Sequence, residues 1–251
     1  MDVLIVGAGE MGRWFGEMVD ADLAFADADP AVAAAAAEAV GGRAVALDAD
    51  ARFDAVCVAV PLPAAADAIT EHAPKAERAL LDVTGEMADP VAAMADAAPE
   101  KERVSLHPLF AAANAPGTVA VVADAPGSVS DRLLDDLRAA GNELAETTPA
   151  EHDAAMETVQ AGAHAAVLAF ALAAEDVPEG LTTPVFEELS SVAARVTGND
   201  PRVYAEIQAA FEGADRVAAA ARRLADADDE SFADLYREAG RRLDARTEDD
   251  P

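Results

Sequence analysis

The chain has 251 residues, enough to bury a sizeable core in one or two domains. Its 48 acidic and 18 basic residues give a formal charge of −30, which argues against nucleic acid or an anionic membrane surface as a partner. The 52% of hydrophobic residues exclude an acidic disordered protein. Scattered acids, abundant alanine and only two lysines are typical of proteins from a salt-rich cytoplasm, where salt screens the self-repulsion.

Cysteine usage and hydropathy bear on the compartment. Cys57, the only cysteine, lies within an apolar run, which fits a reducing compartment. The N-terminus begins directly with a strand pattern, so we predict no signal peptide. The longest nearly apolar run, 161–174, contains His164 and is shorter than the roughly 20 residues that span a bilayer. We therefore predict a soluble, cytoplasmic protein without a metal site.

The N-terminal half is organised around its first strand and the glycine turn that follows. Val3–Val6 is wholly apolar, as expected of a strand buried on both faces of a parallel sheet. A Gly-x-Gly-x-x-Gly motif follows and leads into a helix, whose N-terminus offers N–H groups to phosphates. The first glycine allows a tight turn, the second a close pyrophosphate, and the third close packing of helix on strand. We predict dinucleotide contacts from Gly7, Gly9, Glu10, Met11 and Gly12.

An acidic residue follows the second predicted strand, Leu23–Ala26. Asp27 lies 18 residues beyond Gly9, where a carboxylate would accept hydrogen bonds from the ribose hydroxyls of NAD. The alternative is one more acidic surface residue. No Arg or Lys that could meet a 2′-phosphate follows before Arg43, so the sequence favours NAD over NADP, with Arg13 as the residue that could reverse this preference.

Strand and helix patterns alternate up to residue 147. Further strands are predicted at 44–47, 55–60, 79–83, 104–106 and 118–122, and helices at about 64–72 and 130–140, with an alanine-rich helix that begins at Asp29-Pro30. This alternation predicts an α/β, Rossmann-type, doubly wound parallel sheet. Ligands of such sheets lie outside the carboxyl ends of the strands. Val60 and Pro61 fall at such an end and are predicted to contact the cofactor, and Thr84 and His107 fall at two others.

From Thr148 onward the pattern is all-helical. Thr148 and Glu151 form a predicted capping box for a helix that runs to about Ala174. Because this helix is apolar almost all round, we expect it to be central and buried. Its polar residues have the spacing of a single stripe, which lines either a site or a satisfied core network: Asp153, Glu157, Gln160 and His164.

Three further helices are predicted at 184–196, 202–221 and 230–245. The domain organisation is then a dinucleotide-binding domain over 1–147, a helical substrate and dimerisation domain over 148–247, and an acidic tail over 248–251.

Several stretches, in this order along the chain, together resemble the prephenate dehydrogenase family, most closely its archaeal branch. They are Gly7–Phe15, His107–Phe110, Glu151–Asp153 with Gln160 and His164, and Thr183–Gln208 with Arg195, Asn199–Pro201 and Tyr204. The resemblance implies an oxidative decarboxylation in which prephenate and NAD give 4-hydroxyphenylpyruvate, carbon dioxide and NADH. It also implies a homodimer formed through the helical domains.

The resemblance implies roles for individual residues as well. His107 would hydrogen-bond the ring hydroxyl and take its proton as hydride leaves the same carbon, and a histidine is a suitable base near neutral pH. Arg195 would grip a substrate carboxylate, for which a guanidinium is well suited. His164 and Gln160 would bind substrate. The plainer alternatives are a loop histidine at 107 and a surface arginine at 195.

Two places depart from the family pattern. Where many relatives carry a serine that assists the catalytic histidine, and a lysine two residues on, this chain has Gly85 and Met87. The glycine usual after the His-Pro pair is replaced by Ala111-Ala112. Thr84 offers a hydroxyl from the neighbouring position, so we take it as a second catalytic candidate.

The same sequence features are compatible with other substrates and with other protein classes. Arogenate is an alternative substrate, and β-hydroxyacid dehydrogenases and imine reductases also pair a Rossmann domain with helices. The hydroxyacid enzymes need a lysine on the helical side, whereas Lys75 and Lys101 both precede it. Gly85 and Met87 would also suit a non-catalytic NAD-binding regulator, although the joint presence of the predicted site residues speaks against that role.

Overall fold

The computed structural model describes residues 1–178 and 180–248, which form two compact units, Met1–Ala155 and Met156 onward. A Rossmann-type α/β region is followed by an all-helical one, as the sequence predicts. The first unit also includes most of the helix that begins at Pro149, so it extends beyond the change of pattern at residue 148.

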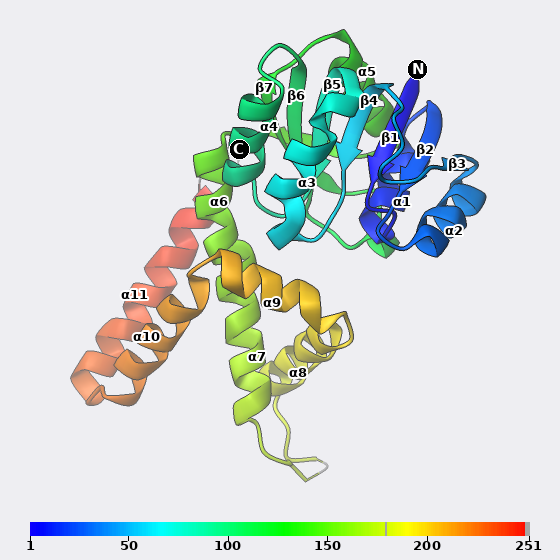
Figure 1. The fold of residues 1–251 in the computed structure, drawn as a ribbon. Coiled ribbons are helices and arrows are strands. Elements are labelled where there is room, and N and C mark those ends of the chain that lie inside the picture. Colours follow the sequence, from blue (N-terminus) through cyan, green and yellow to red (C-terminus); the bar gives the residue numbers. More distant parts are fainter. Residues whose placement is uncertain (179, 249–251) are drawn as a thin grey trace. The chain divides into compact units, whose positions relative to one another are not determined.

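The first unit is built on one eight-stranded sheet with the order β3-β2-β1-β4-β5-β6-β7-β8 (Figure 1). The strands are β1 Asp2–Val6, β2 Asp22–Ala26, β3 Arg43–Ala44, β4 Phe53–Val58, β5 Ala76–Val83, β6 Glu102–Pro108, β7 Thr118–Ala125 and β8 Glu143–Glu146. All neighbours from β3 to β6 pair in parallel. The strand order reverses between β1 and β4, which is where sheets of this kind bind their ligands.

Helices cover both faces of this sheet. They are α1 Glu10–Met18, α2 Pro30–Val40, α3 Ala65–His72, α4 Ala88–Ala97 and α5 Ser128–Ala139. The first unit also contains most of α6 Pro149–Met156 and 3-10 turns at Leu62–Ala64, Ala73–Lys75 and Ala112–Asn114. Neighbouring residues of one strand enter opposite apolar cores: Leu81 packs in the same core as Phe15, and Leu80 in the same core as Ile69. This arrangement explains why the strands are continuous apolar runs rather than alternating ones.

The far edge of the sheet differs from the all-parallel prediction. β7 runs antiparallel to β6, pairing Leu106 with Val121 and His107 with Ala120. The connection 109–117 is shorter than the dozen or more residues that a parallel crossover takes, so the chain turns back. β8 and α4 were not predicted, because Glu-Leu-Ala-Glu offers a single large apolar residue and α4 is rich in alanine with a proline in its first turn.

The second unit begins within the long helical run. Its elements are a π-helical turn Glu157–Gly162, α7 Ala163–Ala173, α8 Pro184–Thr197, α9 Pro201–Ala210, α10 Gly213–Ala225 and α11 Asp229–Glu248. The single helix predicted at 202–221 is in fact two, because the chain leaves the helical conformation at Phe211 and buries that ring. A Cβ at Gly213 would lie 2.2 Å from the carbonyl oxygen of Glu157, so α10 meets the π-helical turn backbone to backbone. Of the predicted acidic tail, Glu248 ends α11 and 249–251 lie outside the described residues.

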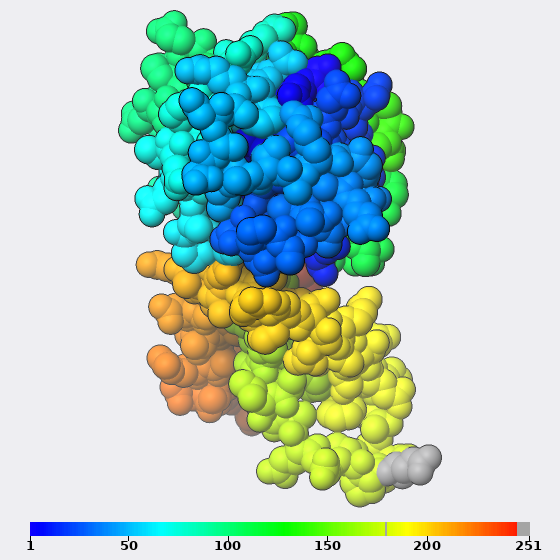
Figure 2. All heavy atoms as spheres, turned by 45° about the vertical axis from the view of Figure 1, so that its right-hand side comes forward, coloured from blue at the N-terminus to red at the C-terminus, as the bar shows by residue number. Residues whose placement is uncertain are grey.

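The expectation that the long helix is buried is wrong for α7. Within the described chain none of its residues is buried, and Leu172 is 88% exposed. The small buried cluster of this unit consists instead of Met156, Ala161, Ile207 and Phe211. In Figure 2 atoms of this yellow-green stretch reach the surface of the second unit. By length and composition alone the whole run Pro149–Ala173 is sufficient to cross a membrane, because the helix is longer than the apolar stretch 161–174 considered from the sequence.

Candidate active site

The glycine turn has the geometry of a phosphate cradle. Gly7 has φ +93°, and a Cβ there would lie 2.2 Å from the carbonyl oxygen of Ala59. A Cβ at Gly12 would lie 2.0 Å from the carbonyl oxygen of Gly7, so α1 packs tightly on the turn. A Cβ at Gly9 would meet no described atom within 4 Å apart from its immediate chain neighbours. Gly9 also caps α1 without a side-chain hydrogen bond from any described residue, so the first N–H groups point to the space beside Gly9.

The remaining predicted cofactor residues border this turn. Glu10 and Met11 form the first turn of α1. Val60 and Pro61 follow β4, the strand beside β1, and a Val60 methyl lies 3.1 Å from the Cβ position of Gly7. These residues therefore adjoin the glycine turn, and their contact with a cofactor stays a prediction.

Asp27 makes hydrogen bonds that the sequence did not reveal. Its Oδ2 accepts a hydrogen bond from the Ala8 N–H at 2.8 Å, and its Oδ1 accepts one from the Asp29 N–H at 2.9 Å. It also lines a pocket together with Asp48 and other residues of the β2–α2 and β3–β4 connections. Asp27 thus anchors the glycine turn, and each carboxylate oxygen keeps acceptor capacity for a further partner.

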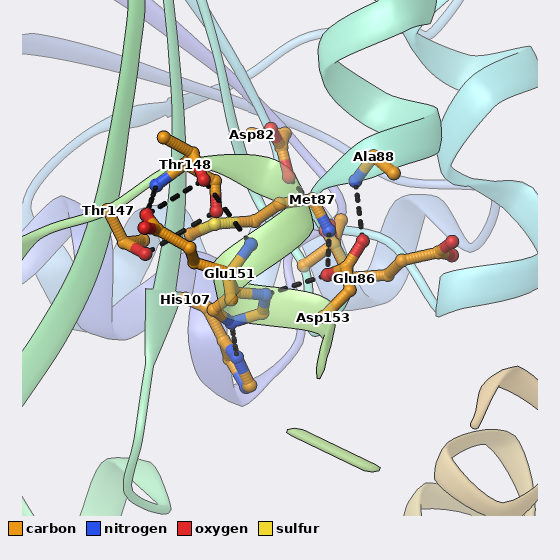
Figure 3. Close-up of polar contacts among 11 residues, drawn as sticks. Asp82, Glu86, Met87, Ala88, His107, Thr147, Thr148, Glu151 and Asp153 are labelled. Carbon is orange, nitrogen blue, oxygen red and sulfur yellow. Dashed lines mark hydrogen bonds and ion pairs between the residues drawn. The ribbon is translucent and has the colours of Figure 1, made fainter. Parts of the chain in front are cut away.

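His107 lies near the carboxyl end of β6 and belongs to a chain of buried polar side chains (Figure 3). Its Nδ1 is 2.8 Å from Nε2 of His152, and the two rings meet edge to face. His152 Nδ1 lies 2.7 Å from Oδ1 of Asp153. The strand thus presents His107 to a histidine and an aspartate from the start of α6.

Asp153 ends this chain and holds the loop after β5. Its carboxylate accepts hydrogen bonds from the backbone N–H of Met87 at 3.1 Å and of Ala88 at 3.0 Å. Burial raises the pKa of Asp153, but the hydrogen bonds from His152 and from the two backbone N–H groups outweigh it and leave the pKa below its usual value. Asp153 is therefore a carboxylate at neutral pH.

The predicted capping box is confirmed and sets the position of this pair. The Thr148 hydroxyl donates to Oε2 of Glu151 at 2.8 Å, and the Glu151 N–H donates back to the Thr148 hydroxyl at 3.3 Å. A fixed first turn determines where His152 and Asp153 point. The sequence alone does not assign His152 a role, although its place just inside a capped helix is a usable signal.

Burial dominates the electrostatics of His107. Burial and, to a lesser degree, neighbouring His152 lower the pKa of His107 to about 3, although Asp153 opposes the change. The imidazole is consequently neutral over the physiological range, the form that a general base needs before it accepts a proton.

Gly85 stands where many relatives carry a serine, and Thr84 is the neighbouring residue with a hydroxyl. A Cβ at Gly85 would lie 3.7 Å from Nε2 of His107, so a side chain there would stand against the imidazole. The Thr84 hydroxyl lies 2.6 Å from Oδ2 of Asp82 and 3.1 Å from the carbonyl oxygen of Glu86. Its described hydrogen bonds are therefore structural, and a catalytic role for Thr84 stays a prediction.

Asp82 is a buried carboxyl group in the middle of the sheet. Burial raises its pKa to about 7, although hydrogen bonds from Thr84 and Ser105 act in the opposite direction. The Thr84 hydroxyl has two acceptors within reach, Oδ2 of Asp82 and the Glu86 carbonyl oxygen, and its single proton can be donated to only one of them at a time.

Three predicted substrate residues belong to the second unit. Arg195 is exposed on α8, and among the described residues its guanidinium has no acidic partner despite the large excess of acids. The Asn199 side chain donates to the Arg195 carbonyl at 2.8 Å and to the Tyr204 hydroxyl at 2.9 Å. His164 on α7 packs edge to face on Tyr204, with ring centroids 4.7 Å apart.

The predicted polar stripe is broken by the π-helical turn, which contains Glu157 and Gln160. Glu157 pairs with Arg216 of α10, whereas His164 lies against Tyr204. Because a π turn holds more residues than an α turn, the regular spacing assumed from the sequence does not persist. The roles of Gln160, His164 and Arg195 toward substrate stay predictions.

The comparisons with known proteins agree with this architecture, although no family profile matches the chain. A curated 4-amino-4-deoxyprephenate dehydrogenase of Streptomyces pristinaespiralis is 32% identical over 268 residues, covering 94% of this chain and 88% of that protein. A prephenate dehydrogenase from A. aeolicus, solved with hydroxyphenyl propionate and NAD+, is similar with a TM-score of 0.70 at 15% identity and covers 98% of both chains. Synechocystis arogenate dehydrogenase has a TM-score of 0.67 at 16% identity and covers 99% of both.

The sheet, the glycine cradle and the helical second unit define a dehydrogenase of the class that uses NAD(P) and pairs a Rossmann domain with a helical one. The identity with the Streptomyces enzyme over nearly the whole length is more specific. The chain belongs to the prephenate dehydrogenase family.

Proposed function

We propose that this protein is an NAD-dependent prephenate dehydrogenase that forms 4-hydroxyphenylpyruvate by oxidative decarboxylation. The observation that carries the proposal is His107, a neutral and buried imidazole at the carboxyl end of β6. As in other doubly wound sheets, ligands are expected beyond this end of the strands.

The reaction requires a base that accepts the hydroxyl proton and a cationic group that binds a substrate carboxylate. A bound nicotinamide would supply the hydride acceptor. His107 would take the ring hydroxyl proton as the hydride leaves the same carbon, while the ring carboxylate departs as carbon dioxide and the ring becomes aromatic. The guanidinium of Arg195 would hold a substrate carboxylate through two parallel hydrogen bonds.

The preference for NAD is proposed from the charges around the adenosine end. Asp27 and Asp48 line the pocket there and would repel a 2′-phosphate. Arg43, the first basic residue after Asp27, is held by Asp2 through contacts of 2.7 and 2.8 Å. Asp27→Ala should raise the KM for NAD and reduce the preference of the enzyme for NAD over NADP. If the wild type prefers NADP, the assignment of Asp27 is wrong and Arg13 becomes the residue to test.

The similarity to the Streptomyces enzyme favours a second candidate substrate, 4-amino-4-deoxyprephenate. An amine then replaces the ring hydroxyl, and the same base would remove a proton from it. The test is NADH formation with prephenate, arogenate and the amino analogue at equal concentrations. The highest kcat/KM with prephenate supports the proposal, the highest with another substrate reassigns it, and no turnover with any of them would leave the non-catalytic regulator.

We also propose a cytoplasmic homodimer formed through the helical unit. Leu172 at 88% and Val159 at 58% exposure leave apolar surface that a second copy would cover. Light scattering in molar salt should give twice the monomer mass. A monomer mass would overturn the dimer, and partition into detergent would indicate a membrane role for Pro149–Ala173 instead.

A further inference from the structure

We propose that His152 and Asp153 are positioning residues that fix the tautomer of His107, so that its Nε2 carries no proton and can accept one. The inference rests on the proposed function only for the identity of the substrate. It stands on one continuous row of hydrogen bonds in the first unit, from the backbone after β5 to the imidazole at the end of β6 (Figure 3).

The row begins at Asp153. An ionised carboxylate can only accept hydrogen bonds, and this one already accepts from the N–H groups of Met87 and Ala88. Its Oδ1 is also 2.7 Å from Nδ1 of His152, a distance that requires a proton between them. The proton must therefore be on Nδ1 of His152.

The second link follows from the first. A neutral His152 with its proton on Nδ1 has a lone pair on Nε2. That atom lies 2.8 Å from Nδ1 of His107, so with His152 in this form the proton between the two rings is on Nδ1 of His107, which donates. Since His107 is neutral, its single proton is then on Nδ1, and Nε2 is the basic nitrogen. Both rings are buried, which limits competition from water for these hydrogen bonds.

The opposite arrangement would disable the base. If His152 carried protons on both nitrogens, it would donate to Nδ1 of His107, and the proton of a neutral His107 would sit on Nε2. That histidine could give a proton but could not take one. When His152 is neutral, Asp153 determines which of the two arrangements forms, because it holds the single proton of His152 on Nδ1. The role of the row is therefore to orient His107, and not to supply or store protons.

The proton balance during turnover is simple. Nε2 of His107 gains the proton that the substrate loses, and the ring becomes an imidazolium. Its Nδ1–H continues to donate to His152, whose Nδ1–H continues to donate to Asp153. No proton needs to reach Asp153, because the carboxylate stabilises the positive charge through two oriented hydrogen bonds.

The kinetic test compares substitutions at His152 with the same substitution at a buried histidine outside the row. His152→Phe keeps a ring but cannot accept a hydrogen bond, and it should lower kcat by about 10²-fold or more with the substrate KM changed less than about threefold. His152→Gln offers an amide oxygen to Nδ1 of His107 and should recover most of that loss. His72→Phe, at an equally buried histidine on α3, controls for the cost of the replacement itself.

A second measurement keeps the inference testable without turnover. ¹⁵N chemical shifts of His107 in the substrate-free protein should report the Nδ1–H tautomer in the wild type and in His152→Gln, and a mixture in His152→Phe. A wild-type His107 protonated on Nε2, or equal kcat in His152→Phe and His72→Phe, would overturn the inference. Because the tautomer is read without substrate, this result is independent of whether prephenate proves to be the substrate.

Discussion

The two units differ in how completely they bury their apolar residues. In the first unit Leu4 is 1% exposed and Leu81 is fully buried, because helices cover both faces of the sheet. In the second unit α7 is the most apolar helix, yet the described chain buries none of its residues. The first unit completes its own core, whereas the described part of the second unit leaves the apolar side chains of α7 uncovered.

The same contrast holds for the predicted site residues. His107 lies 2.8 Å from the buried His152, which in turn lies 2.7 Å from Asp153. Arg195 is exposed at the end of a long flexible side chain, with only its backbone carbonyl held by Asn199. If the proposed roles hold, the rigid setting of His107 and the exposed setting of Arg195 predict different kinetic effects when each is replaced.

The largest expected effect is the loss of the base in the first unit. His107→Asn should lower kcat by about 10²–10⁴-fold, the usual contribution of general acid–base catalysis, with little change in the KM for prephenate. Steady-state NADH formation measures both constants. An unchanged kcat would remove His107 from the chemistry and with it the contrast between the units.

The matching change in the second unit should differ in kind. Arg195→Gln should raise the KM for prephenate by about 10–100-fold, the value of a charge-assisted hydrogen bond of about 1.5–3 kcal/mol, and should alter kcat less. Arg222→Gln on α10 serves as a charge-matched control in the same unit. A larger effect on kcat than on KM would assign Arg195 to the chemical step.

A third prediction addresses the uncovered helix. Leu172→Glu should convert the dimer to monomer, because a charge at this exposed apolar position opposes its burial against a second copy. Leu109→Glu, at an exposed leucine of the first unit, should leave the dimer intact. Analytical ultracentrifugation at molar salt distinguishes them, and equal masses for the two variants would place the interface elsewhere.

Asp82 gives a pH-dependent prediction within the buried core of the first unit. Because burial raises its pKa to about 7, the folded state retains a proton that the unfolded chain loses near pH 4. Its favourable contribution is therefore complete below about pH 4 and is lost as the pH rises through 7. Asp82→Asn should melt higher than the wild type at pH 8, and the difference should shrink toward pH 4. A difference constant with pH would show that Asp82 keeps an ordinary pKa.

The smallest expected effect involves both units together. With a formal charge of −30, the melting temperature should rise with potassium chloride, since the Debye length falls from roughly 10 Å at 0.1 M to roughly 3 Å at 1 M. A separate, salt-dependent melting step of the second unit would show that the two units differ in stability as well as in burial. A melting temperature independent of salt would argue against adaptation to a salt-rich cytoplasm.

The sequence by itself determined the features that neighbouring residues encode. The buried first strand, the glycine turn, the cap of Asp29 on α2 and the capping box at Thr148 all depend on side chains within a few positions of one another. Short spacing leaves few alternative conformations, so such patterns can be interpreted without knowing the rest of the chain.

Only the tertiary structure decided which distant residues meet. It reversed β7, left α7 exposed and tied Asp27 to the Ala8 N–H. It also brought His152 to His107, 45 positions apart, where each became the other's hydrogen-bond partner. Neither periodicity nor capping carries information about such pairs, because they depend on how strands and helices from separate parts of the chain pack around one sheet.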